Sequence, residues 1–262
     1  MPELPEVETV VRSVRAHLEG RRIVAAEFTS PHVTPGNRSA LARKLTGRTI
    51  RSVERHGKFI QIALDEGFLT VHLGMTGKLL IEGRVEIHTY GVFTLDQGAL
   101  LYHDPRQFGS IEWSAKVSPR VAKLGPEPLE ISLDEFRRRL KRKTKIKALL
   151  LNQTFLAGVG NIYADESLFA AGIHPLASAV NISKARAEKL YQAIRGILAH
   201  AIELGGSSIS DYVDAEGKKG WFQMEHRVYG REGEACARCG GPIKKTLVAQ
   251  RGTHFCPRCQ KR

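Results

Sequence analysis

The sequence predicts an α+β protein of two domains, an N-terminal antiparallel β-sandwich with flanking helices and a helical domain that ends in a metal-clasped hairpin. Three observations predict this fold. Short apolar runs separated by turn residues fill positions 23–113, helical periodicity takes over near residue 133, and all four cysteines lie in the last 27 residues. A chain of 262 residues is long enough for two ordinary domains.

The bulk composition is that of a globular protein. Hydrophobic residues at 42% and charged residues at 26% exclude a collagen, a coiled coil and wholesale disorder. No apolar run approaches the roughly 18 residues that span a bilayer, and the start Met-Pro-Glu-Leu-Pro-Glu lacks the basic and apolar parts of a signal peptide. We therefore expect a soluble cytoplasmic protein that does not enter a membrane.

The charge of the chain indicates a polyanionic partner. Lysine and arginine number 40 against 27 acidic residues, which gives a net charge of +13. This favours nucleic acid or an acidic membrane surface, although a protein that is merely basic also fits. Eight basic residues fall within 137–147, and residues 218–262 contain eleven against three glutamates. Both stretches could line a DNA groove, while a solvated helix face remains open for the first.

The first domain is predicted over residues 1–115. An i, i+3, i+4, i+7 apolar stripe predicts a helix over 5–19 that ends at Gly20, and its members are Val7, Val10, Val11, Val14 and Leu18. Short β-type runs follow at 59–64, 68–71 and 100–102, separated by turns at 65–67 and 97–98. Strands of this kind need two packed sheets to bury them.

A linker is predicted over residues 116–132, where glycine and three prolines interrupt any periodicity. A helical domain follows over 133–217. Its helices are expected from Ser132 or Asp134 to about residue 143, and over 145–151, 162–171 and 183–204. The glycine-rich turn at 158–161 separates two of them, and residues 214–220 read as a mobile polar loop.

The last segment, residues 218–262, has the cysteine spacing of a zinc hairpin. Two Cys-x2-Cys turns lie sixteen residues apart and can face one ion with four thiolates, those of Cys236, Cys239, Cys256 and Cys259. We therefore expect one structural Zn²⁺. Two disulfides are the alternative, which a reducing cytoplasm disfavours. Four thiolates leave no open position for a catalytic water.

The N-terminus offers a candidate nucleophile. If the initiator methionine is removed, Pro2 presents a secondary amine of pKa near 8, followed at once by Glu3. Attack of such an amine on a sugar anomeric carbon gives an iminium ion, which acidifies the adjacent sugar proton and lets phosphate leave by elimination. Glu3 and Glu6 would transfer protons. The alternative is a proline that only starts a helix, with acids complementing its dipole.

Motifs distributed over nearly the whole chain give a family resemblance. They are the start Met-Pro-Glu-Leu-Pro-Glu-Val-Glu-Thr, Gly57-Lys58-Phe59, the runs 72–77 (His-Leu-Gly-Met-Thr-Gly) and 104–109 (Asp-Pro-Arg-Gln-Phe-Gly), 158–166 (Gly-Val-Gly-Asn-Ile-Tyr-Ala-Asp-Glu) and 251–256 (Arg-Gly-Thr-His-Phe-Cys). In this order they resemble the bacterial formamidopyrimidine-DNA glycosylases, the Fpg or MutM branch of the Fpg/Nei family. The resemblance implies a monomeric, bifunctional DNA glycosylase and abasic-site lyase. It would excise 8-oxoguanine and formamidopyrimidines from damaged duplex DNA by β,δ-elimination in the bacterial cytoplasm, and its second domain would be a helix–two-turn–helix domain.

Within this resemblance the N-terminal residues take catalytic roles. Pro2 is the implied Schiff-base nucleophile, Glu3 the essential acid/base and Glu6 a supporting carboxylate. Lys58 and His72 are implied to hold phosphates beside the lesion. On spacing alone, a solvated lysine and a core histidine remain open.

Three further residues would occupy the gap left by an everted base. The resemblance implies that Met75 plugs the stack, Phe108 wedges between bases and Arg106 donates to the unpaired cytosine. Without the family context, Met75 and Phe108 also fit a hydrophobic core. The chain departs from the family pattern at Gln107, a position that is usually basic, so one DNA contact and its salt dependence are in doubt.

The second domain carries the remaining implied contacts. Asn161 would grip phosphates at the glycine-rich turn, Lys147 would reach the lesion phosphate, and Arg251 would contact a phosphate from the tip of the zinc hairpin. The loop 211–222 would enclose the flipped purine, with Gly217 and Gly220 permitting closure. Two alternatives stay open: an Nei-like enzyme for oxidised pyrimidines, and a catalytically silent DNA-binding protein on the same scaffold.

Overall fold

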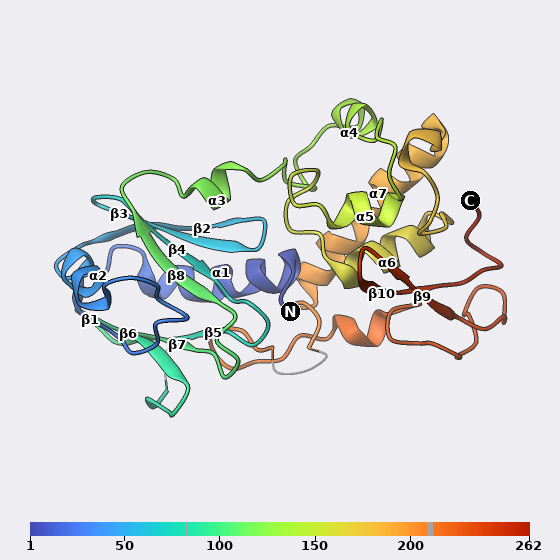
Figure 1. Ribbon diagram of the computed structural model, residues 1–262. Helices are drawn as coiled ribbons and strands as arrows, with labels where there is room; N and C mark the ends of the chain where they lie inside the picture. The colour runs from blue at the N-terminus through green and yellow to red at the C-terminus, as the bar shows by residue number, and fades with distance from the viewer. Residues whose placement is uncertain (82, 209–211) are drawn as a thin grey trace. The chain divides into compact units, whose positions relative to one another are not determined.

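The computed structural model describes residues 1–81, 83–208 and 212–262, which form two compact units (Figure 1). The sandwich unit comprises residues 1–123 and 204–223, and the helical unit comprises 124–203 and 224–262. Within the described residues, no helix is both long and apolar enough to cross a membrane.

The predicted N-terminal helix is confirmed as α1 (Leu4–Leu18). Its valine stripe and Leu18 are buried in the core of the sandwich unit, where α1 contacts strands of both sheets. Pro5 occupies the first turn, where its missing N–H costs no hydrogen bond. The helix thereby fixes the chain terminus at one place on the sandwich.

Two antiparallel four-stranded sheets form the predicted sandwich. One has the order β1-β6-β7-β5, and its strands are β1 (Ile23–Phe28), β6 (Thr89–Leu95), β7 (Ala99–His103) and β5 (Lys78–Leu80). The other has the order β2-β3-β4-β8, and its strands are β2 (Ile50–His56), β3 (Phe59–Leu64), β4 (Phe68–His72) and β8 (Ser110–Ser114). Apolar side chains of both sheets share one buried cluster, as two packed sheets require.

Two short helices of the sandwich unit were not predicted. The helix α2 (Arg38–Leu45) is capped by Asn37, which accepts from the N–H of Ala40, but it buries only Leu45. The helix α3 (Pro119–Ala122) lies inside the predicted linker and starts after Ser118. Neither carries an apolar stripe long enough to produce a helical period.

The helical unit contains the four predicted helices with shifted ends. They are α4 (Leu133–Arg139), α5 (Ile146–Leu151), α6 (Asn161–Ala170) and α7 (Lys184–Glu203). Ser132 caps α4, and that helix ends well before residue 143. Short 3-10 turns lie at η1 (Ala179–Asn181) and η2 (Phe222–Glu225). The helix α6 is buried from Ile162 to Phe169 and contacts α5, α7 and the terminal hairpin.

The terminal hairpin pairs β9 (Lys244–Val248) with β10 (Arg251–Phe255). Its two-residue turn, Ala249 and Gln250, has φ values of 49° and 60°. Positive φ at both central residues matches the right-handed twist of the two strands, so the turn holds their register. Arg251 is exposed at the first position after that turn.

Candidate functional site

The N-terminal residues form a buried polar cluster at the start of α1. Pro2 is buried, and Glu3 and Glu6 are 2% and 1% exposed. The N–H of Glu3 donates to Oε2 of Glu6 at 2.8 Å, which fixes the second carboxylate against the chain terminus. Two acidic side chains are thus held beside the group predicted to act as nucleophile.

The charges around the N-terminus reveal which other residues surround it. Burial lowers the pKa of the Met1 amine below its usual value. The carboxylates of Glu3 and Glu6 oppose this shift, while the cations of Lys58 and Arg106 add to it. Residues far apart in the sequence thus converge on the terminus.

Lys58, in the turn that precedes β3, and His72, the last residue of β4, lie close enough to interact electrostatically. Lys58 lies between β2 and β3 and is only 7% exposed, which excludes the solvated surface lysine. Burial, together with the cations of Arg120 and Lys58, lowers the pKa of His72 to about 4. The N–H of Gly74 donates to Nδ1 of His72 at 3.1 Å, so the proton of the neutral ring sits on Nε2. His72 can therefore donate to a phosphate without being charged.

The three predicted gap-filling residues lie on two loops at the surface. Met75 is 37% exposed and Phe108 is 59% exposed, so neither belongs to the core. The guanidinium of Arg106 stacks over the ring of Phe108 at 4.8 Å. The backbones of the two loops touch, since a Cβ on Gly74 would lie 2.4 Å from the carbonyl carbon of Phe108. The structure thus presents an exposed apolar and cationic group of the expected kind.

One buried carboxylate, which was not predicted from the sequence, is hydrogen-bonded to both of these loops. Asp104 is fully buried, accepts from Oγ1 of Thr76 at 2.6 Å and accepts from the N–H of Gly109 at 2.9 Å. Thr76 follows Met75, while Gly109 follows Phe108. The available signal was an acid directly after the buried strand β7, a position where a charge needs partners.

The segment 204–223 differs from its predicted place in the helical domain because it docks on the sandwich unit. The N–H of Ser207 donates to Oε1 of Glu6 at 2.7 Å, and the hydroxyl of Tyr212 donates to the Glu6 carbonyl at 3.1 Å. Ala215 is buried in the sandwich core, and its N–H donates to Oγ of Ser13. Tyr212 and Ala215 are therefore anchored to the sandwich unit, while residues 216–219 between Ala215 and Gly220 are exposed. Asp211, the first residue of the predicted 211–222 loop, lies outside the described residues.

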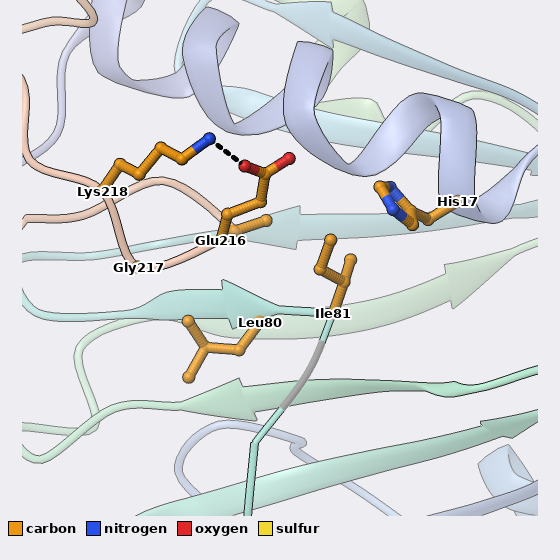
Figure 2. Close-up of a pocket in the computed structure, with 7 residues that line it drawn as sticks. His17, Leu80, Ile81, Glu216, Gly217 and Lys218 are labelled. Carbon is orange, nitrogen blue, oxygen red and sulfur yellow. Dashed lines mark hydrogen bonds and ion pairs between the residues drawn. The ribbon is translucent and has the colours of Figure 1, made fainter.

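A cavity of about 530 Å³ lies beside this docked segment (Figure 2). It is lined by α1, by the end of β5 and by the turn that contains the Lys218–Glu216 ion pair, through His17, Leu80, Ile81, Ala215, Glu216, Gly217 and Lys218. The lining includes residues 215–218 of the loop that was predicted to enclose the purine, but none of the described residues with a predicted catalytic or phosphate-binding role.

Lys147 and Asn161 are brought together in the helical unit, where Lys147 lies in the interior. It is fully buried, and its Nζ lies 2.7 Å from Oδ1 of Asp165. It also donates to Oγ1 of Thr253 at 2.8 Å and to the Gly252 carbonyl at 3.2 Å. A charge this deep requires a partner, and Asp165 supplies it. In this structure the Lys147 side chain therefore holds strand β10.

Two neighbouring carboxylates of α6 hold the C-terminal part of the helical unit. Oδ2 of Asp165 accepts from the N–H of His254 at 2.8 Å. Glu166 accepts from the backbone N–H groups of Arg227, Val228 and Tyr229. Burial nevertheless raises the pKa of Glu166, against the effect of these three hydrogen bonds. The pair of acids in the 158–166 motif therefore organises the segments that precede and include the hairpin.

The four cysteines form a site that fits one structural zinc ion. Their sulfurs lie within 4.8 Å of one another, at 3.9 Å for Cys236–Cys259 and 3.5 Å for Cys239–Cys256. A tetrahedral zinc with Zn–S bonds of about 2.3 Å places its sulfurs about 3.8 Å apart. A disulfide would bring them to about 2.05 Å. The zinc prediction is confirmed over the disulfide alternative, and the ion anchors the hairpin that carries Arg251.

Comparisons with known proteins agree along the whole chain. Residues 1–111 match the model of the formamidopyrimidine-DNA glycosylase N-terminal domain, residues 124–213 that of the H2TH domain, and residues 233–262 that of a zinc finger found in FPG and IleRS. A formamidopyrimidine-DNA glycosylase of Solibacter usitatus is 58% identical, with 100% of both chains covered.

Solved structures with this fold have been determined with damaged DNA. A Lactococcus lactis FPG mutant in complex with a Fapy-dG containing DNA is 40% identical, with a TM-score of 0.91 and 100% of both chains covered. A MutM in complex with carbocyclic 8-oxo-G containing DNA is 40% identical, with a TM-score of 0.90 and the same coverage. The architecture expected from the sequence is therefore confirmed.

Proposed function

The chain belongs to the formamidopyrimidine-DNA glycosylase family, and we propose that it removes oxidised purines from duplex DNA and cleaves the strand through the amine of Pro2. The observation that carries this proposal is the buried N-terminal cluster. Glu3 and Glu6 lie at the terminus, and the charges of Lys58 and Arg106 are felt there. The substrates are purines such as 8-oxoguanine and formamidopyrimidines, which are the lesions in the related complexes.

Removal of Met1 gives Pro2 the secondary amine that the chemistry needs. Its nitrogen attacks C1′ as the glycosidic bond breaks, and the purine leaves with the bonding electrons and takes up a proton. The amine then loses its proton, the C1′–O4′ bond breaks, and O4′ accepts a proton from Glu3 while the nitrogen lone pair forms the iminium. Glu6, bonded to the Glu3 N–H, orients this acid.

Strand cleavage follows from the iminium as an electron sink. Loss of the C2′ proton to a carboxylate gives an enamine with a C1′=C2′ bond, whose electrons then expel the 3′ phosphate and leave C2′=C3′ conjugated with the re-formed iminium. Loss of the C4′ proton then expels the 5′ phosphate, and water returns Pro2 as the free amine. The product is a one-nucleotide gap bounded by phosphates.

The remaining residues place the everted nucleotide. Lys58 and neutral His72 hold the phosphates beside the lesion, while Met75 and Phe108 fill the stack and Arg106 donates to the unpaired cytosine. Asn161 and Arg251 contact flanking phosphates from the helical unit, and Lys147 supports them by holding β10. The protein acts as a monomer in the bacterial cytoplasm.

Borohydride trapping tests the nucleophile. With a duplex that carries 8-oxoguanine opposite cytosine, reduction should join the DNA covalently to the N-terminal peptide, whose mass should lack Met1. A variant that retains one extra residue before Pro2 should lose the adduct, and Glu3→Gln should lose turnover while it still binds DNA. An undiminished adduct with the blocked terminus would exclude Pro2.

A competition experiment tests the substrate class. Equal amounts of an 8-oxoguanine duplex and a thymine glycol duplex are offered in one tube, and the nicked products are separated by length. We expect preferential cleavage at the oxidised purine. Preference for thymine glycol would favour the Nei-like alternative.

A further inference from the structure

Gln107 lies between two exposed residues of the gap-filling group, Arg106 and Phe108. Its backbone has a left-handed conformation that residues other than glycine rarely adopt. Its φ is 53°, and in the described part of the chain the other non-glycine residues with positive φ are Ala249 and Gln250 of the hairpin turn. A left-handed residue costs about 1–2 kcal/mol unless its surroundings hold it. The turn at Gln107 leaves the side chains of Arg106 and Phe108 close enough to stack.

The side chain of Gln107 is held by a buried hydroxyl. Oγ of Ser30 donates to Oε1 of Gln107 at 2.6 Å, and Ser30 is 3% exposed. Oγ of Ser30 also accepts from the N–H groups of His32 and Val33, each at 3.2 Å. A hydroxyl has one proton and two acceptor positions, so both acceptor positions are used. The Ser30 hydroxyl can therefore make one further hydrogen bond, in which it is the donor. Its partner at position 107 must be an acceptor.

Ser30 lies in a buried turn that is tied to the core of the sandwich. Val33 is fully buried, and its carbonyl accepts from the N–H of Ile111 at the start of β8. The carbonyl of Ser30 accepts from the N–H of Thr34. The Ser30 turn is thus tied to a sheet, and the Gln107 side chain connects the exposed loop to that turn.

We propose that Gln107 is a positioning residue for base eversion. By accepting from Ser30, it fixes the left-handed turn that holds Arg106 and Phe108 together for insertion into the vacated stack. This inference rests on the proposed function of that pair. The side-chain oxygen of Gln107 performs this role, and a cation at the same position cannot replace it, because lysine and arginine offer donors only.

Two substitutions distinguish the role of Gln107 as a hydrogen-bond acceptor from an effect of charge at position 107 on DNA binding. Gln107→Glu keeps an acceptor for Ser30 but adds a charge that DNA repels, whereas Gln107→Lys removes the acceptor and adds a charge that DNA attracts. Both keep a Cβ, so the backbone strain is the same. For an 8-oxoguanine duplex we expect Gln107→Glu to raise KM and retain kcat. Gln107→Lys should lower KM and reduce kcat about three- to tenfold, the loss expected for one hydrogen bond.

Salt dependence gives a second readout of the same pair. Gln107→Lys should steepen the slope of log affinity against log salt by about 0.9, as one added phosphate contact does. If kcat instead follows charge, higher for Gln107→Lys and lower for Gln107→Glu, the proposal is wrong. It is equally wrong if both variants have the kcat of the wild type.

A third variant links the effect to Ser30. Gln107→Met removes the acceptor without charge and should reduce kcat as Gln107→Lys does, while Gln97→Met, on an exposed turn, should change nothing. Ser30→Ala should reduce kcat less when it is added to Gln107→Met than when it is made alone, because the interaction with Gln107 is already lost. Multiplying losses would show that Gln107 acts independently of Ser30. Thermal unfolding of each variant confirms that the fold is retained.

A preformed abasic duplex distinguishes failure of this inference from failure of the proposed function. No base has to be extruded there, so Gln107→Met should trap with borohydride within twofold of the wild type. A defect of equal size on both substrates would contradict a role in eversion. Absence of trapping by the wild-type protein would instead contradict the proposed function.

Discussion

Lys147 and Asn161 donate to the same acceptor, the carbonyl oxygen of Gly252, at 3.2 Å and 2.9 Å. Gly252 follows Arg251, the exposed residue at the tip of the hairpin. The family resemblance implies phosphate contacts for both Lys147 and Asn161. In the structure both side chains hold the backbone next to Arg251 and therefore help to fix its position. The zinc ion holds one end of the hairpin, and the Lys147–Asp165 pair holds the strand next to the turn.

Removal of one member of this buried pair should destabilise the helical unit. Lys147→Met leaves the Asp165 carboxylate uncompensated, which costs about 3–5 kcal/mol in comparable buried pairs. The double variant Lys147→Met/Asp165→Asn removes both charges and keeps an acceptor for His254, so it should be more stable than the single variant. Urea unfolding of the three proteins measures this order. A single variant as stable as the wild type would contradict the importance of the pair.

A double-mutant cycle tests whether Lys147 acts through Arg251. The double variant Lys147→Met/Asp165→Asn should weaken binding to an abasic duplex by less than Arg251→Ala does. When it is added to Arg251→Ala, it should weaken binding no further, because the positioned group is gone. Additive losses in titrations at fixed salt would indicate a direct DNA contact by Lys147.

Local sequence patterns predicted the chemical groups of the site, but they did not predict which distant residues pack against one another. The spacing of four cysteines constrains two turns toward one ion, and the stripe of α1 places Pro2 at a helix start, so both could be read from neighbours in the chain. The bonds from Asp104 to Thr76 and from Gln107 to Ser30 join residues 28 and 77 positions apart. No period or spacing encodes such pairs.

The same limit applies to two other features of the structure. Only the tertiary structure shows that Lys147, a member of a basic run, is buried against Asp165. The glycines and charges of residues 214–220 indicate a loop, yet Ala215 is buried against the sandwich. In both cases a long-range partner overrides the local composition.

Zinc removal should abolish DNA binding by the hairpin without unfolding the sandwich unit. No disulfide joins the four cysteines, so without the ion the two Cys-x2-Cys turns lose the bonds to zinc that link them, and the hairpin opens. Chelation followed by metal analysis and a gel-shift titration should show loss of affinity together with loss of metal. Metal-free protein of unchanged affinity would contradict a structural role for the ion. Cys239→Ser is a genetic counterpart, and Ser178→Ala, remote in sequence from the thiolates, is its control.

Stability should fall as the pH drops from about 6.5 to about 4, partly because of His72. Burial and the cations of Arg120 and Lys58 lower the pKa of its folded form to about 4 from the ordinary 6.5. Between these values the unfolded chain binds the proton and the folded chain does not, so the contribution is complete above 6.5 and declines toward 4. His226 is shifted in the same way, by burial and Arg231.

The variant His72→Gln isolates the first of these groups. Its amide oxygen can accept from the Gly74 N–H, but the side chain does not titrate. The free energy of unfolding should therefore fall less between pH 7 and pH 5 than in the wild type. Identical pH profiles from chemical denaturation at each pH would show that His72 is protonated equally in both states.

The turn at Gly206 should be essential to catalysis because it fixes Glu6. Gly206 has φ of 81°, and a Cβ there would lie 2.8 Å from Oε1 of Glu6, the atom that accepts from the Ser207 N–H. Gly206→Ala must displace that carboxylate, and through its other oxygen the N–H of Glu3. Single-turnover cleavage should slow about tenfold on both an 8-oxoguanine duplex and a preformed abasic duplex, the cost of about 1.4 kcal/mol of transition-state stabilisation. Gly205→Ala is the matched control, since its φ is 72° but the nearest atom to its Cβ is 3.5 Å away. Equal losses in the two variants would assign the effect to backbone strain, whereas a loss confined to Gly206→Ala would assign it to the position of Glu6.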